Sequence, residues 1–366
     1  MTSVEATLLP RPTPVQLIDV SGAPHPDPDY AVPPADVLRE GYRNLVFGRR
    51  LNDVCGALVR QGRLAVYPSS RGQEASQVAA GMVLRYEDWL FPTYRDVVAI
   101  AVKGVSTAET IGLLHGNWHS GYDSRAERVA TQSTPLATQL LHAVGFAYAA
   151  KHRGEDTVVL AMCGDGATSE GDFHEALNFA AVFKVPVVFF VQNNGYAISV
   201  PIARQTAAPG LAYKGIGYGI PSEQVDGNDF AAVYAVLSHS VSRARSGDGP
   251  SLVEALTYRV EAHTNADDDT RYRDSAEVAE WVARDPVDRL RQYLTAQGIL
   301  DEQTEADITA GAEHIADQLR ESANLNDIPN PLDLFAHVYS EPTPQLLEQS
   351  RVLERDLARE LEGHHD

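Results

Sequence analysis

The chain has 366 residues, of which 44% are hydrophobic, and its formal net charge at pH 7 is −20. The apolar fraction is too high for a disordered protein, and the length corresponds to roughly two domains or one large α/β domain with extensions. Nucleic acid and anionic membranes would repel so acidic a chain, so neither is expected as a main partner.

The sequence predicts a cytoplasmic protein. Its first residues, MTSVEATLLPRPTP, lack the charged and apolar regions of a signal peptide. No stretch approaches the roughly 18 apolar residues that a membrane span requires. Cys55 and Cys163 are the two cysteines, which are too few for a disulfide framework and fit a reducing compartment.

Proline dominates the N-terminal segment. Residues 1–34 hold eight of the 21 prolines, a density that forbids a helix and predicts an extended arm. Such an arm is either a disordered tail or a segment that wraps a partner, and the sequence does not choose between them. From residue 35 to about residue 64 apolar side chains recur at helical spacing, which predicts a helix.

Apolar strand-like runs and helix-like segments alternate through the middle of the chain. The runs TVVLAM, PVVFFV and SLVEALTYRV begin at residues 157, 186 and 251, and helical periodicity covers residues 170–184 and 230–245. Continuous apolar strands separated by helices are typical of a parallel sheet with helices on both faces. The expected fold class is therefore α/β.

A glycine-rich segment follows the first of these runs and opens the next helix. Gly164 and Gly166 flank Asp165 in CGDGATSEGD, so the backbone can approach an anion closely and the helix N-terminus favours phosphate. The next run ends in QNNGY, and loops at one edge of a parallel sheet bring Asp165 and Asn194 to face one point. A carboxylate and an amide oxygen suit Mg²⁺, which takes its other ligands from phosphate and water. The pattern predicts a diphosphate held through a metal ion.

Other phosphate sites match the segment less well. A nicotinamide site requires G-x-G-x-x-G and an acidic residue at the end of the second strand. Ser169 stands in place of the third glycine, and the second strand ends in Gln192, Asn193 and Asn194. The G-K-[ST] of a P-loop does not occur. A tight turn with a solvated Asp165 is the remaining structural alternative.

The segment GDGATSEGDFHEALNFAAVFKVPVVFFVQNNGYAIS resembles the α subunit of the E1 component of 2-oxo acid dehydrogenase complexes. Its GDG, 26 further residues and the NN pair match the thiamine diphosphate motif of that family. The resemblance extends from about residue 70 to about residue 273. It implies the thiamine-diphosphate-binding fold over residues 35–275, between the Pro-rich arm of residues 1–34 and a helical C-terminal extension over residues 276–366.

The resemblance also implies contacts to the cofactor. The implied metal ligands are the side chains of Asp165 and Asn194 and the backbone carbonyl of Tyr196. Contacts to thiamine diphosphate are implied for Tyr94, Arg95, Thr134, Leu136, Gly164, Asp165, Gly166, Ala167, Asn194 and His263. Arg95 would reach the phosphates, for which the fixed fork of a guanidinium is well suited, although a surface ion pair is the alternative. Leu136 would support the aminopyrimidine ring.

Two further roles come from the resemblance. His263 matches the active-site histidine, which near a pKa of about 6.5 would bind a phosphate oxygen or assist the acyl intermediate. In some relatives a potassium ion is bound by residues that correspond to Ser133, Thr138 and Gln139, although such an oxygen-rich run also makes an ordinary helix cap.

The family likeness implies an enzyme that needs a second chain. The glutamate that activates the cofactor comes from a β subunit in two-chain members, and no motif in this chain clearly supplies it. The implied assembly is an α₂β₂ heterotetramer that decarboxylates a 2-oxo acid and passes the acyl group to the lipoyl arm of an E2 partner.

Three substrates fit the likeness. The Asp-Asp pair and the length of the loop HTNADDDTRYR favour branched-chain 2-oxo acids over pyruvate, with acetoin cleavage third. A non-catalytic subunit that binds the cofactor or supports assembly is the alternative from another class.

Overall fold

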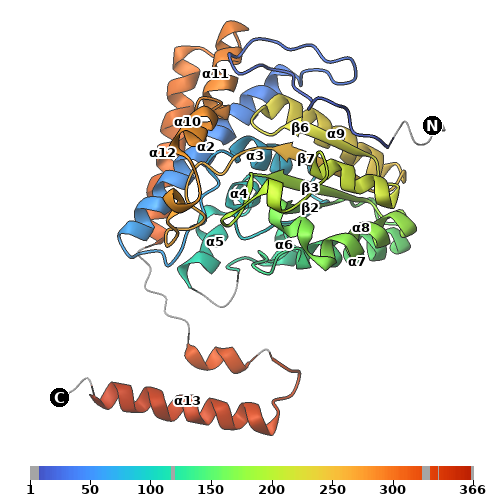
Figure 1. Cartoon of the computed structure of the whole chain (residues 1–366). Coiled ribbons are helices and arrows are strands. Elements are labelled where there is room, and N and C mark those ends of the chain that lie inside the picture. The colour runs from blue at the N-terminus through green and yellow to red at the C-terminus, as the bar shows by residue number, and fades with distance from the viewer. Residues whose placement is uncertain (1–7, 117–119, 324–329, 337, 364–366) are drawn as a thin grey trace.

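A parallel sheet of five strands forms the centre of the computed structural model, which describes residues 8–116, 120–323, 330–336 and 338–363. The strand order is β1-β2-β3-β7-β6, and every neighbouring pair is parallel (Figure 1). The strands are β1 (Trp89–Phe91), β2 (Val159–Gly164), β3 (Val187–Asn193), β7 (Ser251–Leu256) and β6 (Ser222–Asp226). The expected α/β class with a parallel sheet is confirmed.

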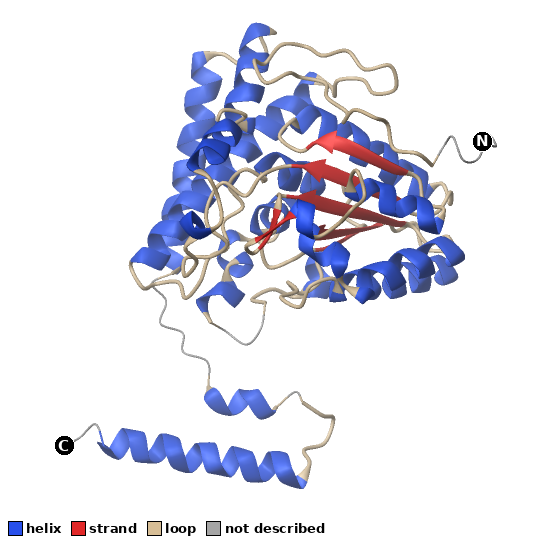
Figure 2. Cartoon of the chain, in the orientation of Figure 1, coloured by secondary structure: helices blue, strands red, loops and turns tan. Residues whose placement is uncertain are grey.

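Alternate residues of each central strand enter different cores, because successive side chains point to opposite faces of a sheet. Leu160 of β2 and Val188 of β3 pack into a core with helices α2 (Ala35–Arg60), α3 (Glu74–Met82), α4 (Val97–Lys103) and α9 (Phe230–Arg245). Val159 and Phe189 enter the second core, under α7 (Thr138–Arg153) and α8 (Gly171–Phe183). Helices therefore cover both faces, as Figure 2 shows.

Segments outside the ladder cover both edges of the sheet. Val15 of the N-terminal arm forms a parallel bridge to Val225 of β6, and at the other edge Val129 pairs with Leu90 and Ser133 with Thr93. Covered edges leave few free backbone groups for pairing with another chain. The bridge between Ser133 and Thr93 also brings residues 133–136 against the loop that follows β1.

The arm packs against the chain's own body. Leu17 and Ile18 are each 1% exposed, and their backbone N–H groups donate to Asp229 Oδ2 over 2.7 and 2.8 Å. Arg289 Nε donates to the carbonyl of Ile18 over 2.9 Å. Val15, Leu17 and Ile18 thus belong to the core, and residues 8–34 are held against the body of the chain instead of forming a disordered tail.

The remaining elements lie around this unit. They are the helices α5 (Thr107–Thr110), α6 (Ser124–Glu127), α10 (Ser275–Val282), α11 (Pro286–Ala296), α12 (Glu302–Ser322) and α13 (Pro344–Gly363), and the hairpin of β4 (Tyr196–Ala197) and β5 (Val200–Pro201). Short 3₁₀ helices lie at Gly112–His115, Asp165–Ser169, Ile202–Arg204, Leu211–Tyr218, Asp269–Arg271 and Pro331–Phe335.

The C-terminal part is helical, as expected. Helices α11 and α12 pack on α2, whereas α13 stands apart from the sheet in Figure 1. Among the helices that the structure describes, none is both long and apolar enough to cross a membrane. Cys55 and Cys163 are both buried free thiols.

Candidate active site

Asp165 and Asn194 meet at the carboxyl edge of the sheet. Asp165 opens the short 3₁₀ helix after β2, and Asn194 follows β3, whose register pairs Gly164 with Gln192. The Asn194 backbone N–H donates to Asp165 Oδ1 over 3.3 Å, and the two residues are 6% and 1% exposed, respectively. The parallel topology thus brings together two oxygen-bearing side chains that are 29 residues apart in the chain.

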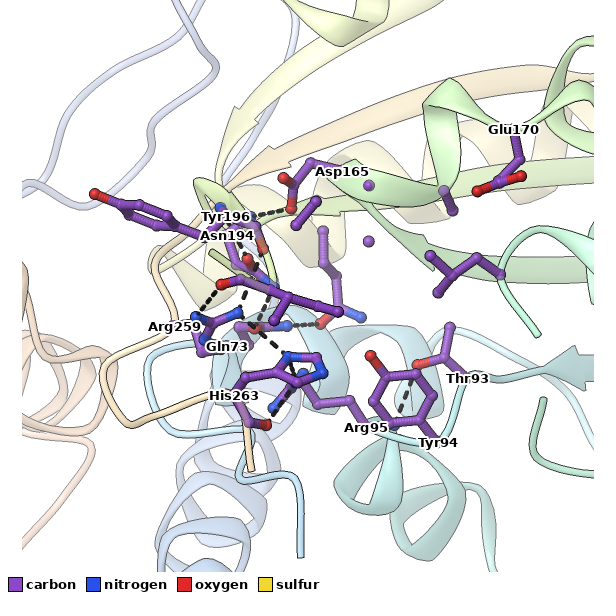
Figure 3. Close-up of a pocket in the computed structure, with 17 residues that line it drawn as sticks. Gln73, Thr93, Tyr94, Arg95, Asp165, Glu170, Asn194, Tyr196, Arg259 and His263 are labelled. Carbon is purple, nitrogen blue, oxygen red and sulfur yellow. Dashed lines mark hydrogen bonds between the residues drawn. The ribbon is translucent and has the colours of Figure 1, made fainter. Parts of the chain in front are cut away.

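A cavity opens over this pair (Figure 3). It is lined by Gln73, Thr93, Tyr94, Arg95, Leu136, Gly164, Asp165, Gly166, Ala167, Glu170, Gln192, Asn194, Tyr196, Ala197, Ile198, Arg259 and His263. Nearly every residue for which the family likeness implies a cofactor contact is in this lining. Thr134 is exposed and is not among the lining residues.

The glycines leave room for an anion beside the backbone. A Cβ atom added at Gly164 would meet no atom within 4 Å, so the backbone there borders open space. At Gly166 an added Cβ would lie 2.8 Å from the Cβ of Ala197, so a side chain there would displace the β4 hairpin. The segment therefore offers bare backbone at the start of a helix, which suits a diphosphate.

The Asp165 carboxylate suits a cation. Burial raises its pKa, and Gln205 Nε2 opposes this by donating to Oδ2 over 2.6 Å. Among the described residues, no Lys, Arg or His nitrogen lies within ion-pair distance of it. An ionised buried carboxylate is costly unless it is paired or coordinates a metal. A cation bound between Asp165 and Asn194 would remove that cost.

Tyr196 also lines the cavity and is linked to Asn194 and Arg259 through its backbone. Its backbone N–H donates to Asn194 Oδ1 over 3.3 Å, and its carbonyl accepts a hydrogen bond of 3.4 Å from Arg259 Nη1. The phenol hydroxyl points away from Asp165 and donates to Glu277 over 2.9 Å (Figure 3). Only the backbone of Tyr196 is thus placed to contribute a ligand.

His263 lies between two buried guanidinium groups on the opposite wall (Figure 3). Arg95 Nη2 is 3.1 Å and Arg259 Nη1 3.4 Å from its Nδ1, and Arg95 Nη2 also donates to the His263 carbonyl. Desolvation and these two positive charges lower the pKa of His263 to about 4. The pKa thus lies below the expected value of about 6.5, because the half-buried ring loses solvation and faces two arginines, and of the two expected forms the neutral imidazole is favoured.

The neutral imidazole has a defined tautomer. Because Nδ1 faces two guanidinium donors, it accepts, and the proton is on Nε2. The His263 backbone N–H donates to Asp267 Oδ2 over 2.9 Å, which fixes the start of the following loop. His263 is therefore a hydrogen-bond donor at neutral pH, not a cation.

Arg95 has partners within the chain. It is 5% exposed, and its Nη1 donates to the Ser69 carbonyl over 2.8 Å. Together with its bonds to His263, this contact joins the loop after β1 both to the segment at Ser69 and to the loop that carries His263. The alternative of a surface ion pair is wrong, since the group is buried in the cavity wall.

The three residues of the implied potassium site lie outside the cavity lining. Ser133 Oγ donates to the Pro135 carbonyl over 2.8 Å, and Thr138 Oγ1 lies 3.5 Å from Asp172 Oδ2. Gln139 Nε2 donates to the Met162 carbonyl over 2.8 Å, while its Oε1 is buried and has no partner among the described residues. The two hydroxyls act as donors in these contacts and keep their lone pairs, and Gln139 Oε1 has no donor in the described part of the chain, so all three oxygens can still face a cation.

Sequence reasoning missed Gln73, Gln205 and Arg259. Arg259 gave a signal, since it interrupts the apolar run SLVEALTYRV four residues before His263. Gln73 and Gln205 gave none, because neither lies in a motif and both act on residues far along the chain. Reasoning from the ends of strands found Asp165 and Asn194, and the family resemblance added Tyr94, Arg95, Leu136 and His263.

Comparison with known proteins places the chain in a family. Residues 42–331 match the family model described as dehydrogenase E1 component. The chain belongs to this family.

Two relatives illustrate its range. The chain is 48% identical over 349 residues to the 3-methyl-2-oxobutanoate dehydrogenase subunit alpha of Mycobacterium tuberculosis, covering 94% of this chain and 95% of the relative. It is 38% identical over 316 residues to the pyruvate dehydrogenase E1 component subunit alpha of Staphylococcus aureus, covering 86% and 85%. Membership of this family implies thiamine diphosphate as the cofactor. The likeness to the branched-chain type exceeds that to the pyruvate type.

Proposed function

We propose that this chain is the α subunit of a branched-chain 2-oxo acid dehydrogenase E1 component. With a β subunit it would catalyse the oxidative decarboxylation of acids such as 3-methyl-2-oxobutanoate and transfer the acyl group to the lipoyl group of an E2 acyltransferase. The observation that carries the proposal is that Asp165 and Asn194 meet beside the open backbone at Gly164. The type of 2-oxo acid is proposed because the chain is more similar to the branched-chain relative than to the pyruvate relative. The buried free thiols fit a reducing cytoplasm.

Mg²⁺ would be held by Asp165, Asn194 and the Tyr196 carbonyl, and the diphosphate by the backbone of residues 164–167. When bound, thiamine diphosphate supplies the nucleophilic carbon and the electron sink for decarboxylation. Arg95 and Arg259 place two positive charges at the same cavity, where they favour anionic groups. The neutral His263 donates from Nε2, so it holds an oxygen without adding a charge.

The β subunit would complete the cavity. Asp165 and Glu170 are the carboxylates among its described lining residues, and Asp165 is assigned to the metal. Glu170 is the exposed residue before α8 and lies on the Asp165 side of the cavity, across from His263, in Figure 3. Neither is free to activate the aminopyrimidine, which supports an α₂β₂ assembly in which β provides that glutamate.

A potassium ion is proposed at Ser133, Thr138 and Gln139. The buried, unpaired Oε1 of Gln139 supports it, because an acceptor left without a donor costs about 1–3 kcal/mol. Potassium titration of melting temperature would test it, with Gln139→Leu expected to abolish the dependence.

Turnover of the complex tests the proposal. The chain would be co-expressed with its β partner and assayed with thiamine diphosphate, Mg²⁺ and an artificial electron acceptor, comparing 3-methyl-2-oxobutanoate with pyruvate. Preference for the branched acid is expected, and preference for pyruvate would assign the 2-oxo acid of the second relative instead. Activity that survives Asp165→Ala would contradict the metal site. Decarboxylation of neither acid would leave a non-catalytic cofactor-binding subunit.

A further inference from the structure

Four buried side chains form a continuous line of hydrogen bonds that ends at Asn194. Gln192 Nε2 donates to Asp96 Oδ1 over 2.7 Å, and Gln73 Nε2 donates to Gln192 Oε1 over 3.2 Å. Asn194 Nδ2 then donates to Gln73 Oε1 over 3.0 Å. We call Asp96, Gln192, Gln73 and Asn194 the amide relay.

The relay is enclosed and spans three elements. Asp96 precedes α4, Gln73 precedes α3, and Gln192 is the penultimate residue of β3. Asp96, Gln73, Gln192 and Asn194 are 0%, 1%, 2% and 6% exposed. Bulk water therefore has little access to these groups, and the direction of each hydrogen bond is set within the protein.

A carboxylate at one end gives the relay a direction. Burial raises the pKa of Asp96, and the hydrogen bonds from Thr93 and Gln192 oppose that rise by stabilising the ionised form. The ionised carboxylate only accepts hydrogen bonds, whereas an amide can be turned to either accept or donate. Asp96 Oδ2 accepts from the Thr93 N–H and Oγ1 over 2.7 and 2.8 Å, so Oδ1 remains to accept from Gln192. Gln192 must then turn Nε2 to Asp96 and Oε1 to Gln73. Gln73 in turn presents its oxygen to the amide NH₂ of Asn194.

The last hydrogen bond of the relay determines which atom of the Asn194 amide, Oδ1 or Nδ2, faces the side of Asp165. With Nδ2 held by Gln73, Oδ1 points away from the relay, toward the side of Asp165 and the Tyr196 N–H (Figure 3). An amide turned the other way would present an NH₂ group, which cannot ligate a cation. The 3.3 Å contact from the Tyr196 N–H favours the same orientation but is long.

We propose that Asp96 is a positioning residue that acts through Gln192 and Gln73 to make Asn194 present its oxygen to the metal. The inference rests on the proposed function, since the metal site belongs to it. Partners outside the ligand set typically change metal affinity 10- to 100-fold when they are lost.

Asp96→Asn tests the direction of the relay with no change in shape. The amide oxygen of the substituted side chain would still accept from Thr93, so its NH₂ would face Gln192. Gln192 and Gln73 would then each turn over, and Asn194 would present its NH₂ to the metal. In the co-expressed complex saturated with thiamine diphosphate, we expect Mg²⁺ affinity by calorimetry to fall about 10- to 100-fold. Mn²⁺ binding by electron paramagnetic resonance should weaken in parallel.

A second substitution should restore the direction. In Asp96→Asn with Gln192→Glu, a carboxylate at position 192 would accept from both the new amide at position 96 and Gln73, so Gln73 would again turn its oxygen to Asn194. The double variant keeps the wild-type net charge, and its Mg²⁺ affinity should return to within about threefold of wild type. A role of Asp96 in stability alone predicts no such rescue.

Asp88→Asn is the matched control. Asp88 is also 0% exposed and lies outside the relay, where it accepts hydrogen bonds from the backbone N–H groups of Val158 and Arg85 and forms an ion pair of 2.7 Å with Arg245. Its replacement should lower the melting temperature and leave Mg²⁺ affinity unchanged. If Asp96→Asn fails to fold, Gln73→Met removes the acceptor of Asn194 Nδ2 directly, and the same loss of Mg²⁺ affinity is expected.

The outcomes separate the relay from the proposed function. Wild-type Mg²⁺ affinity in Asp96→Asn, or in Gln73→Met where that variant is needed, would overturn the relay, as would a double variant that binds as weakly as the single one. Asp165→Ala should abolish Mg²⁺ binding in every case. If Asp165→Ala binds Mg²⁺ normally, the metal site itself is wrong. If it does not bind and Asp96→Asn still does, only the relay is wrong.

Discussion

Gly72 is the position where a single methyl group should disturb both stability and the site. Its φ is +89°, and an added Cβ would lie 2.1 Å from the Tyr258 carbonyl oxygen and 2.7 Å from Val260 Cγ2. The nearest obstacle is backbone, so rotation of a side chain cannot remove the overlap. Arg71 and Val260 are joined by a backbone hydrogen bond of 3.1 Å, which holds the two segments together.

The cost of Gly72→Ala has two parts. A non-glycine residue in the left-handed region costs about 1–2 kcal/mol. Forcing a methyl group into a packed region adds about 1–3 kcal/mol. The sum is about 2–5 kcal/mol, which corresponds to a melting temperature lower by about 4–10 °C at about 2 °C per kcal/mol for a large domain. Because the displaced segment carries Arg259, the affinity for thiamine diphosphate should also fall.

Gly62→Ala separates the backbone cost of a positive φ from the cost of the close contact. Gly62 has φ +70°, and an added Cβ would meet nothing within 4 Å, so only the backbone cost applies. Scanning calorimetry of the α/β complex should give Gly62→Ala a loss of about 2–4 °C, with cofactor affinity unchanged. Equal melting temperatures for the two variants would refute the contact argument, because the variants differ in the contact and not in the sign of φ.

Three other changes have expected outcomes. Since the folded pKa of His263 is about 4 and the ordinary value is 6.5, the unfolded chain takes up the proton first on acidification. Stability should therefore fall from about pH 6.5 to pH 4, and His263→Asn should remove that part of the fall in urea midpoints. Arg95→Met should raise the His263 pKa and so weaken the same pH dependence. Leu17→Ala should cost about 2–5 kcal/mol in urea unfolding with cofactor affinity unchanged, because Leu17 is 1% exposed in the core and does not line the cavity.

The central strands were readable from the sequence because both of their faces are buried. Apolar runs predicted strands near residues 157, 186 and 251, and β2, β3 and β7 lie there. Strand β7 ends at Leu256, although residues 257–260 stay mostly buried, because β3 has ended and their backbones pair with loops instead. The edge strand β6, with sequence SEQVD, carries too many polar residues to stand out.

The contacts of the N-terminal arm could not be predicted from the residues of the arm itself. Its anchors, Asp229 and Arg289, lie 212 and 271 residues further along the chain from the groups that they bind. Proline density correctly predicts an extended backbone, but it carries no information on what the backbone contacts. Contacts of such separation depend on the assembled fold.

The same distinction applies to the site. Asp165 and Asn194 were predictable because parallel topology brings strand ends together whatever the side chains are. Gln73 was not, since its partner Asn194 lies 121 residues away and a single glutamine has no pattern. The pKa of His263 also depends on Arg95, which is 168 residues distant. Local rules therefore predict that Asp165 and Asn194 meet, and the groups that contact them from distant segments follow only from the fold.

The charge of the whole chain opposes the charge of the cavity. A net charge of −20 repels a diphosphate and a 2-oxo acid, but charges more than about 8 Å away are largely screened at physiological ionic strength. Arg95 and Arg259 are buried, so water screens them less, and the neutral His263 between them adds no competing cation. The local field therefore decides binding. High salt should weaken the long-range repulsion more than the attraction, so titrations at increasing ionic strength should show an affinity for the anionic cofactor that is constant or rises slightly.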